Sequence, residues 1–214
     1  MDLDAHLSVV RTRVRLRELR RHGARRLDDG NSFVVASALG LPRLWHYTLA
    51  GVLDGFEQGF TRSHDGRASS MLYLGLQAAR EALAARADAL VERRAPDASI
   101  QCVTVQGDEL HVLAAGPGRV YLHRGDGRPE RLSPREAAAE GLLRGTPAWC
   151  SQPLLPGDLI MTGSLSAFSK DAVHQVGEVL RKDPQIPPRM VTNLLTEPAQ
   201  KSGTGAVALA IRVA

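Results

Sequence analysis

The chain has few of the residues that build disulfide or metal frameworks. Only two of its 214 residues are cysteines, Cys102 and Cys150, and no CxxC pair or Cys/His cluster with metal-ligand spacing accompanies them. Two cysteines form at most one bridge, so neither a disulfide framework nor a structural zinc site is indicated.

Long hydrophobic runs are also absent. No apolar stretch approaches the roughly 18 to 20 residues that a membrane span requires. Acidic Asp2 and Asp4 stand where a secretory signal would carry cations. We therefore expect no membrane span and a cytoplasmic protein. With 43% hydrophobic and 23% charged residues in a chain of this length, the composition is that of one globular domain with a sizeable core.

Positive charge is concentrated at the N-terminus. Residues 1–28 hold eight arginines and four carboxylates, a net +4 that equals the formal net charge of the whole chain. Arginines alternate with Thr, Val and Leu over residues 11–17, which predicts a strand with one solvated face. We assign residues 1–26 as a basic N-terminal segment that forms the first strand and residues 27–214 as the rest of the domain. Such arginines protect a sheet edge from aggregation. The alternative reading, that they bind nucleic acid or an acidic protein, is disfavoured for nucleic acid because aromatic residues for base stacking are scarce nearby.

Hydrophobic periodicity and turn residues predict an α+β domain of antiparallel strands and a few helices. The last strand is apolar on both faces, which places it inside a sheet. The predicted elements are strands at 31–38 and 47–53, a helix at 69–95, three antiparallel strands within 100–123, a strand at 158–162, helices at 171–182 and 188–196, and a strand at 206–213.

Four segments, taken in order, resemble the metal-dependent PPM family of protein phosphatases, the protein phosphatase 2C-like fold, and above all its compact bacterial members of the stage II sporulation E type. The resemblance implies a four-layer α/β/β/α sandwich, with two antiparallel sheets between helices. The segments are LAGVLDGFEQG at 49–59, LHVLAAGPGRVYLHRGDGRPERLS at 110–133, LLPGDLIMTGSLSAFSKDAV at 154–173 and GTGAVALAIRV at 203–213.

Active members of this family hold two divalent cations whose bound water attacks a phosphoserine or phosphothreonine. Ions of the Mg²⁺ or Mn²⁺ type require several carboxylates. At the positions that match the family motifs, only Asp54, followed by Gly55, retains the expected residue, and Asn31 stands where the first aspartate belongs. The other matched positions carry no carboxylate; they are Gly116, Pro117 and Gly118, then Gly163 and Ser164, then Thr204 and Gly205.

A single carboxylate does not hold a pair of divalent cations, so the sequence predicts a pseudophosphatase with no metal cofactor and no catalytic residue. Its vestigial cleft is expected to combine Asn31, Asp54 and the positions just named, and to bind a protein partner through a phosphorylated side chain. The alternative is a divergent Mg- or Mn-dependent serine/threonine phosphatase with rearranged ligands. Asp28 and Asp29 would join Asp54 in a single-metal site if the first strand were shifted, although Asp28 to Asn31 is also a typical polar turn.

Overall fold

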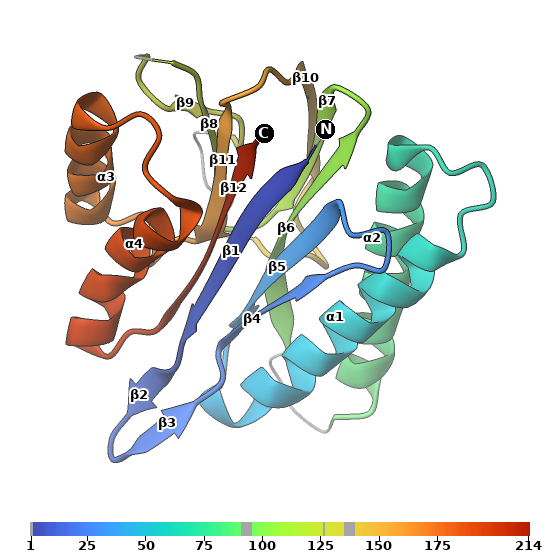
Figure 1. The fold of residues 1–214 in the computed structure, drawn as a ribbon. Helices are drawn as coiled ribbons and strands as arrows, with labels where there is room; N and C mark the ends of the chain where they lie inside the picture. The colour runs from blue at the N-terminus through green and yellow to red at the C-terminus, as the bar shows by residue number, and fades with distance from the viewer. Residues whose placement is uncertain (1, 91–95, 126, 135–139) are drawn as a thin grey trace.

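The computed structural model describes the chain except for residues 1, 91–95, 126 and 135–139. Two five-stranded antiparallel sheets lie face to face, and two helices cover the outer face of each (Figure 1). This is the four-layer sandwich that the sequence implies. In spatial order, the first sheet contains β1 (Leu3–Val10), β12 (Ala206–Val213), β11 (Leu159–Ser164), β8 (Gly118–His123) and β9 (Glu130–Arg131), and the second contains β10 (Ala148–Pro153), β7 (Glu109–Ala115), β6 (Asp97–Gln106), β5 (Ser32–Leu39) and β4 (His22–Arg26).

The helices form two pairs. The first pair packs on the second sheet and the second pair on the first sheet (Figure 1). All three predicted helices are present, with ends shifted by a few residues; the predicted extension of the first one over 91–95 lies outside the described residues. The four helices are α1 (Trp45–Thr61), α2 (Ala68–Asp88), α3 (Lys170–Lys182) and α4 (Pro188–Ser202).

The strand predicted at 47–53 is wrong, because these residues lie within α1. Read over the whole helix, the buried apolar residues recur every three or four positions, as Leu49, Val52, Phe56 and Phe60 show. The seven-residue window was too short to distinguish this helical period from a buried strand. The consequence for the site is direct, since Asp54 belongs to a helix and not to the end of a strand.

Alternation along the strands divides the core into three layers. On β5, Val34 and Ala36 face α1 and α2, whereas Phe33 and Val35 face the other sheet. The last strand behaves in the same way. Its residues alternate between the space between the sheets and the layer below α3 and α4. β12 lies between β1 and β11, which confirms the prediction that this strand is central.

The three strands predicted within 100–123 exist, but they do not form one meander. β6 pairs with β7 in the second sheet, whereas β8 pairs with β9 and β11 in the first sheet. The turn at 116–118 carries the chain from one sheet to the other, and Gly116 there has φ +79°, a conformation that glycine adopts easily. Turn residues mark where a strand ends but not which partner the next strand takes.

The N-terminal segment contributes to both sheets. β1 pairs along its whole length with β12, and β4 pairs with β5. Between them, the single strand predicted over 11–17 is wrong, because the chain reverses there in a hairpin of β2 (Thr12–Val14) and β3 (Arg17–Leu19). Residues 1–26 therefore supply several strands instead of one. Among the described residues, no helix is both long and apolar enough to span a bilayer.

Candidate functional site

A cleft with a mixed polar and apolar lining opens where the ends of both sheets meet α4. Its volume is about 420 Å³. Seven of the lining residues carry a hydroxyl, one carries a guanidinium and one an imidazole, and the other five are leucine, proline or alanine. The residues that line it are Arg21, His22, Ser37, Leu39, Ser99, Pro117, Ser164, Leu165, Ser166, Ser169, Pro198, Ala199, Ser202 and Thr204.

Strand alternation directs polar residues of the second sheet into this cleft. His22 on β4 pairs in register with Ser37 on β5, which in turn pairs with Ser99 on β6. All three are on the same face of the sheet as Val35 and therefore point between the sheets. The polar row lies at one end of a face whose remaining positions are apolar.

His22 is buried and neutral. Its Nδ1 and the Ser37 Oγ form a hydrogen bond of 2.8 Å, whereas Nε2 has no hydrogen-bond partner among the described residues. Burial and, to a smaller extent, the charge of the neighbouring Arg21 lower the pKa of His22 to about 4, against an opposing effect from the backbone of Thr204 and Gly205. The imidazole therefore remains uncharged at neutral pH and presents an unused polar atom.

Other buried polar atoms below the cleft are also unpartnered. The Ser99 hydroxyl, both side-chain amide atoms of Gln101 and the Thr162 hydroxyl are buried and form no hydrogen bond with any residue that the structure describes. A Cβ at Gly118 would lie 1.9 Å from the Gln101 amide carbon, so glycine there makes room for this side chain between the sheets. Unsatisfied buried polar groups cost about 1 to 3 kcal/mol each and are uncommon, so a cluster of them indicates a site that binds a polar group.

The opposite rim comes from the first sheet and its helices. Ser164 Oγ accepts from the Val207 backbone at 3.1 Å, and Ser166 Oγ donates to the Gly205 carbonyl at 2.7 Å. Ser169 caps the N-terminus of α3 by accepting from Ala172 N at 3.3 Å. The cleft therefore faces the positive end of a helix dipole as well as several hydroxyl groups.

The charge of the cleft is positive. The Arg21 guanidinium lies 5.3 Å from the centre of the Trp45 ring and donates to the Ala38 carbonyl at 3.4 Å. Burial lowers the pKa of Arg21 from its usual value, but an arginine remains charged at neutral pH. No aspartate or glutamate is among the described residues that line the cleft.

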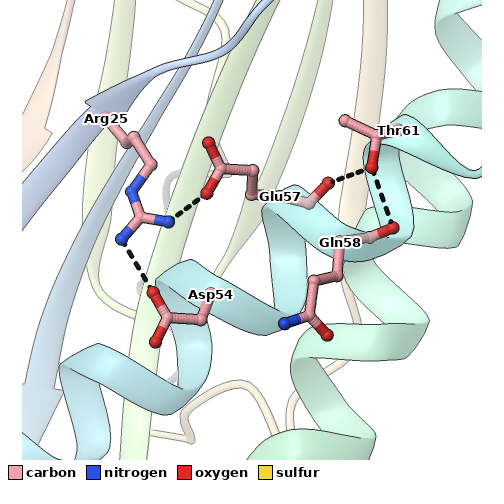
Figure 2. Close-up of polar contacts among 5 residues, drawn as sticks. All are labelled: Arg25, Asp54, Glu57, Gln58 and Thr61. Atoms are coloured by element: carbon pink, nitrogen blue, oxygen red, sulfur yellow. Dashed lines mark hydrogen bonds and ion pairs between the residues drawn. The ribbon is translucent and has the colours of Figure 1, made fainter.

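Asp54 does not lie in the cleft. It projects from α1 toward β4, where Arg25 binds it at 2.8 Å and also binds Glu57 (Figure 2). Burial lowers the pKa of Arg25, but its hydrogen bonds to the two carboxylates outweigh this effect and raise the pKa. Arg25 and His22 are an odd number of residues apart on β4, so their side chains leave opposite faces of the sheet. Asp54 therefore belongs to the helix side of the second sheet, which corrects its assignment as a retained ligand position.

Gly55, paired with Asp54 in the sequence prediction, has a packing role. A Cβ at this position would lie 2.8 Å from the Ala78 carbonyl oxygen of α2. A Cβ at Gly59 would likewise clash with Leu74 of α2. The two glycines together allow α1 and α2 to pack closely. Gly55 thus contributes to the helix pair and not to the cleft.

Asn31 is likewise outside the cleft, because it lies at the start of β5 whereas Ser37 lies near its end. Six residues of extended strand separate the two positions by about 20 Å. Asp29 accepts from the backbone amides of Asn31 and Ser32 at 3.1 and 2.9 Å. The aspartates at 28 and 29 therefore belong to a polar turn, and Asp54 does not join them.

The remaining predicted residues do converge. Pro117, Ser164 and Thr204 line the cleft, and Gly116, Gly118, Gly163 and Gly205 are their chain neighbours. Sequence reasoning missed Arg21, His22, Ser37 and Ser99. A signal for Ser37 was present, because Ser37 stands near the end of the strand predicted at 31–38, just before the turn at Gly40.

Neither a family model nor a curated protein matches the chain. Solved structures do. The catalytic domain of the serine/threonine phosphatase PstP, in complex with two manganese ions, aligns over 99% of each chain with a TM-score of 0.78 and 15% identity. PppA, described as a key regulatory component of T6SS in Pseudomonas aeruginosa, aligns over 98% of this chain and 97% of its own with a TM-score of 0.76 and 18% identity.

The PP2C phosphatase domain of SpoIIE from Bacillus subtilis, with a fragment of its regulatory domain, is also similar. This chain aligns over its full length with 64% of that chain, with a TM-score of 0.67 and 12% identity. These likenesses establish the PPM phosphatase fold, as the sequence resemblance predicted. At such identities they establish the fold and not the activity.

The donor atoms of the cleft do not suit the metal pair of that fold. Hard divalent cations require carboxylate oxygens, and the lining offers hydroxyls, one neutral imidazole and one guanidinium. Across the part of the chain that the structure describes, no group of three or more His, Cys, Asp or Glu side chains is arranged to bind a metal.

Proposed function

We propose that this protein is a pseudophosphatase: a regulatory domain of bacterial-type signalling that keeps the PPM fold, binds a protein partner and does not hydrolyse phosphate esters. The observation that carries the proposal is the lining of the cleft, where hydroxyls and Arg21 stand and no described carboxylate does. Two divalent cations bring a charge of about +4, which this lining does not balance.

The same lining supports binding of a phosphorylated side chain of the partner. A phosphate dianion needs donors and positive charge. Arg21, the Ser99 hydroxyl and the N-terminus of α3 provide both. With no described carboxylate in the cleft, the dianion meets little repulsion. Without a metal-activated water, the phosphate ester would stay intact.

The partner and the compartment are proposed from separate observations. PppA, a similar structure, is described as a regulatory component, which agrees with a regulatory role here. Cys102 and Cys150 are both free thiols, as expected of a protein in the reducing cytoplasm. We keep the cytoplasm as the proposed compartment.

Binding of a fluorescent phosphoserine peptide tests the proposal, with the unphosphorylated peptide as reference. We expect Arg21→Gln to weaken phosphopeptide binding by roughly tenfold or more, since a hydrogen bond to a charged group contributes about 1.5 to 3 kcal/mol. Asp54→Asn is the matched control on the other face of the sheet and should leave binding unchanged. Hydrolysis of an aryl phosphate with added Mn²⁺ should be absent.

Two results would contradict the proposal. Equal affinity for the phosphorylated and unphosphorylated peptides would show that the phosphate does not contribute to recognition. Manganese-dependent turnover would favour the alternative, a divergent metal-dependent serine/threonine phosphatase whose ligands have been rearranged.

A further inference from the structure

The arginine hairpin, residues 11–20, projects from the sandwich as a separate two-stranded sheet (Figure 1). Its five arginines are all exposed, and none forms an ion pair with a described carboxylate. Glu18 is the one acidic residue of the hairpin. The arginines are Arg11, Arg13, Arg15, Arg17 and Arg20.

Protection of a sheet edge does not explain these arginines. The edge strands on this side are β1, which ends at Val10, and β4, which begins at His22. The arginines stand between them, outside both main sheets. Arg13 stands opposite Glu18 across the hairpin, but the other four arginines have no acidic residue opposite them, and like charges on a short hairpin repel one another. Their concentration therefore needs a reason outside the fold.

The tip of the hairpin has two further unusual features. Leu16 is fully exposed, the most exposed large hydrophobic side chain among the described residues. Arg15 has φ +55°, in the left-handed region that residues other than glycine seldom adopt. An apolar side chain is thus held outward by a tight turn, surrounded by guanidinium groups. Arginine next to an apolar anchor is typical of protein interfaces.

The base of the hairpin is fixed to the rim of the cleft. Arg13 N donates to the Gly203 carbonyl at 2.7 Å, and Thr12 Oγ1 donates to the Thr204 carbonyl at 2.9 Å. Val14 and Leu19 pack against the hydrophobic core below α1 and α2. Because Thr204 lines the cleft, a partner bound there passes close to the hairpin.

We propose that the arginine hairpin is a docking surface for an acidic segment of a protein partner, with Leu16 contacting an apolar residue of that segment. The inference rests on the proposed function for the kind of partner, a protein, but not on the chemistry of the cleft. Carboxylates of the segment would pair with arginines that lack partners within the described chain. The interaction would weaken as salt screens these exposed charges.

The distribution of charge favours a short acidic segment over a nucleic acid or an anionic membrane. Residues 29–214 have no net formal charge, since residues 1–28 account for the whole +4. Long polyanions and membrane surfaces attract an extended basic face, and here the excess is confined to one hairpin. The hairpin also contains no aromatic residue on which bases would stack.

Fluorescence anisotropy with a synthetic 12-residue peptide tests this inference. The peptide contains glutamates around a central leucine and carries no phosphate. The variant Arg15→Glu/Arg17→Glu should weaken binding at least about tenfold at low salt, because two attractions become repulsions. Leu16→Ser should weaken it about threefold to tenfold. Arg144→Glu/Arg189→Glu makes the same change in net charge at exposed positions elsewhere and should change binding less than about twofold.

Three results would overturn the inference: no measurable binding of the acidic peptide, equal losses in the hairpin and control variants, or hairpin-dependent binding of a DNA duplex or of phosphatidylserine vesicles that is tighter than peptide binding. Arg21→Gln separates this inference from the proposed function. That variant should weaken binding of the phosphoserine peptide strongly and binding of the unphosphorylated acidic peptide only slightly. The proposed function and this inference can therefore each be contradicted without the other.

Discussion

Polar residues on the two faces of the second sheet differ in whether other side chains bind them. On the helix side, Arg25 neutralises Asp54 and Glu57, and the Ser32 hydroxyl binds both Asp29 and Thr104. On the cleft side, the side-chain polar atoms of Ser99 and Gln101 and one nitrogen of His22 are buried and have no hydrogen-bond partner in the described part of the chain. Polar groups that bind each other stabilise a fold, whereas polar groups left unsatisfied at a cleft are available to a ligand. The carboxylates on the helix side of this sheet therefore stabilise the fold, and the hydroxyls on its cleft side are the candidates for function.

The largest expected effect concerns His22. Its pKa is lowered to about 4 in the folded state, against about 6.5 when unfolded. Between these pH values the unfolded chain binds more protons at this residue, so stability falls as pH falls from 6.5 toward 4. The shift corresponds to about 3 kcal/mol. Denaturant unfolding at pH 7 and pH 4 measures it.

Two variants isolate the contribution of this residue. His22→Asn should remove most of this pH dependence, and exposed His46→Gln should keep it. A pH dependence that is the same in both variants would show that His22 is not buried as described.

The next effect tests the reassignment of Gly55 from the cleft to the helix pair. A methyl group at Gly55 would meet the Ala78 carbonyl, so Gly55→Ala should destabilise the protein by about 1 to 3 kcal/mol. Gly177, in the middle of α3, has open space around it. There the same change should stabilise by about 0.5 to 1 kcal/mol, because alanine favours helix. Thermal unfolding of both variants measures these changes in stability. If Gly55→Ala left the stability unchanged, the close packing of α1 and α2 would be contradicted.

A serine on each face gives a matched pair for the comparison. Ser32→Ala removes a buried hydroxyl that binds two partners, Asp29 and Thr104, and should cost about 1 to 2 kcal/mol. Ser99→Ala removes an unpartnered hydroxyl and should lower the free energy of unfolding by less than about 0.5 kcal/mol. The same variant should weaken binding of the phosphoserine peptide. Urea titration combined with peptide binding measures both. If Ser99→Ala proved as costly as Ser32→Ala, the hydroxyl would have a structural partner.

The smallest effects belong to the ion pairs on the helix side. Arg25→Met should cost about 1 kcal/mol, because the pairs are partly exposed and two carboxylates are left facing each other. Asp54→Asn should cost about 0.5 kcal/mol or less, since Glu57 still binds Arg25. Comparison of the two variants by urea unfolding is sufficient. A larger loss from Asp54→Asn would give this aspartate a role that its position does not explain.

The sequence predicted the architecture better than the site. Glycine and proline turns, the apolar strand at 206–213 and the helical period after residue 68 are local signals, and the structure confirms the elements that they predict. The residues of the cleft are brought together by the register between strands. That register pairs His22 with Ser37 and places both opposite Ser164, which no local pattern reveals.

Asp54 shows why motif matching alone misplaced part of the site. Its Asp-Gly dipeptide resembled a family motif, yet the spacing of Leu49, Val52 and Phe56 around it is helical. The strand that leads into the cleft is β5, which lies earlier in the chain and carries Ser37, not an acidic residue, near its end. A missing carboxylate is harder to find in a sequence than one that is present.

Anomalous scattering from crystals soaked in Mn²⁺ tests the central claim most directly. The cleft around Ser37, Ser99 and Ser164 should show no manganese peak, and a phosphoserine peptide soaked into the same crystals should appear there with its phosphate intact. A pair of ordered manganese peaks at these residues would contradict the account.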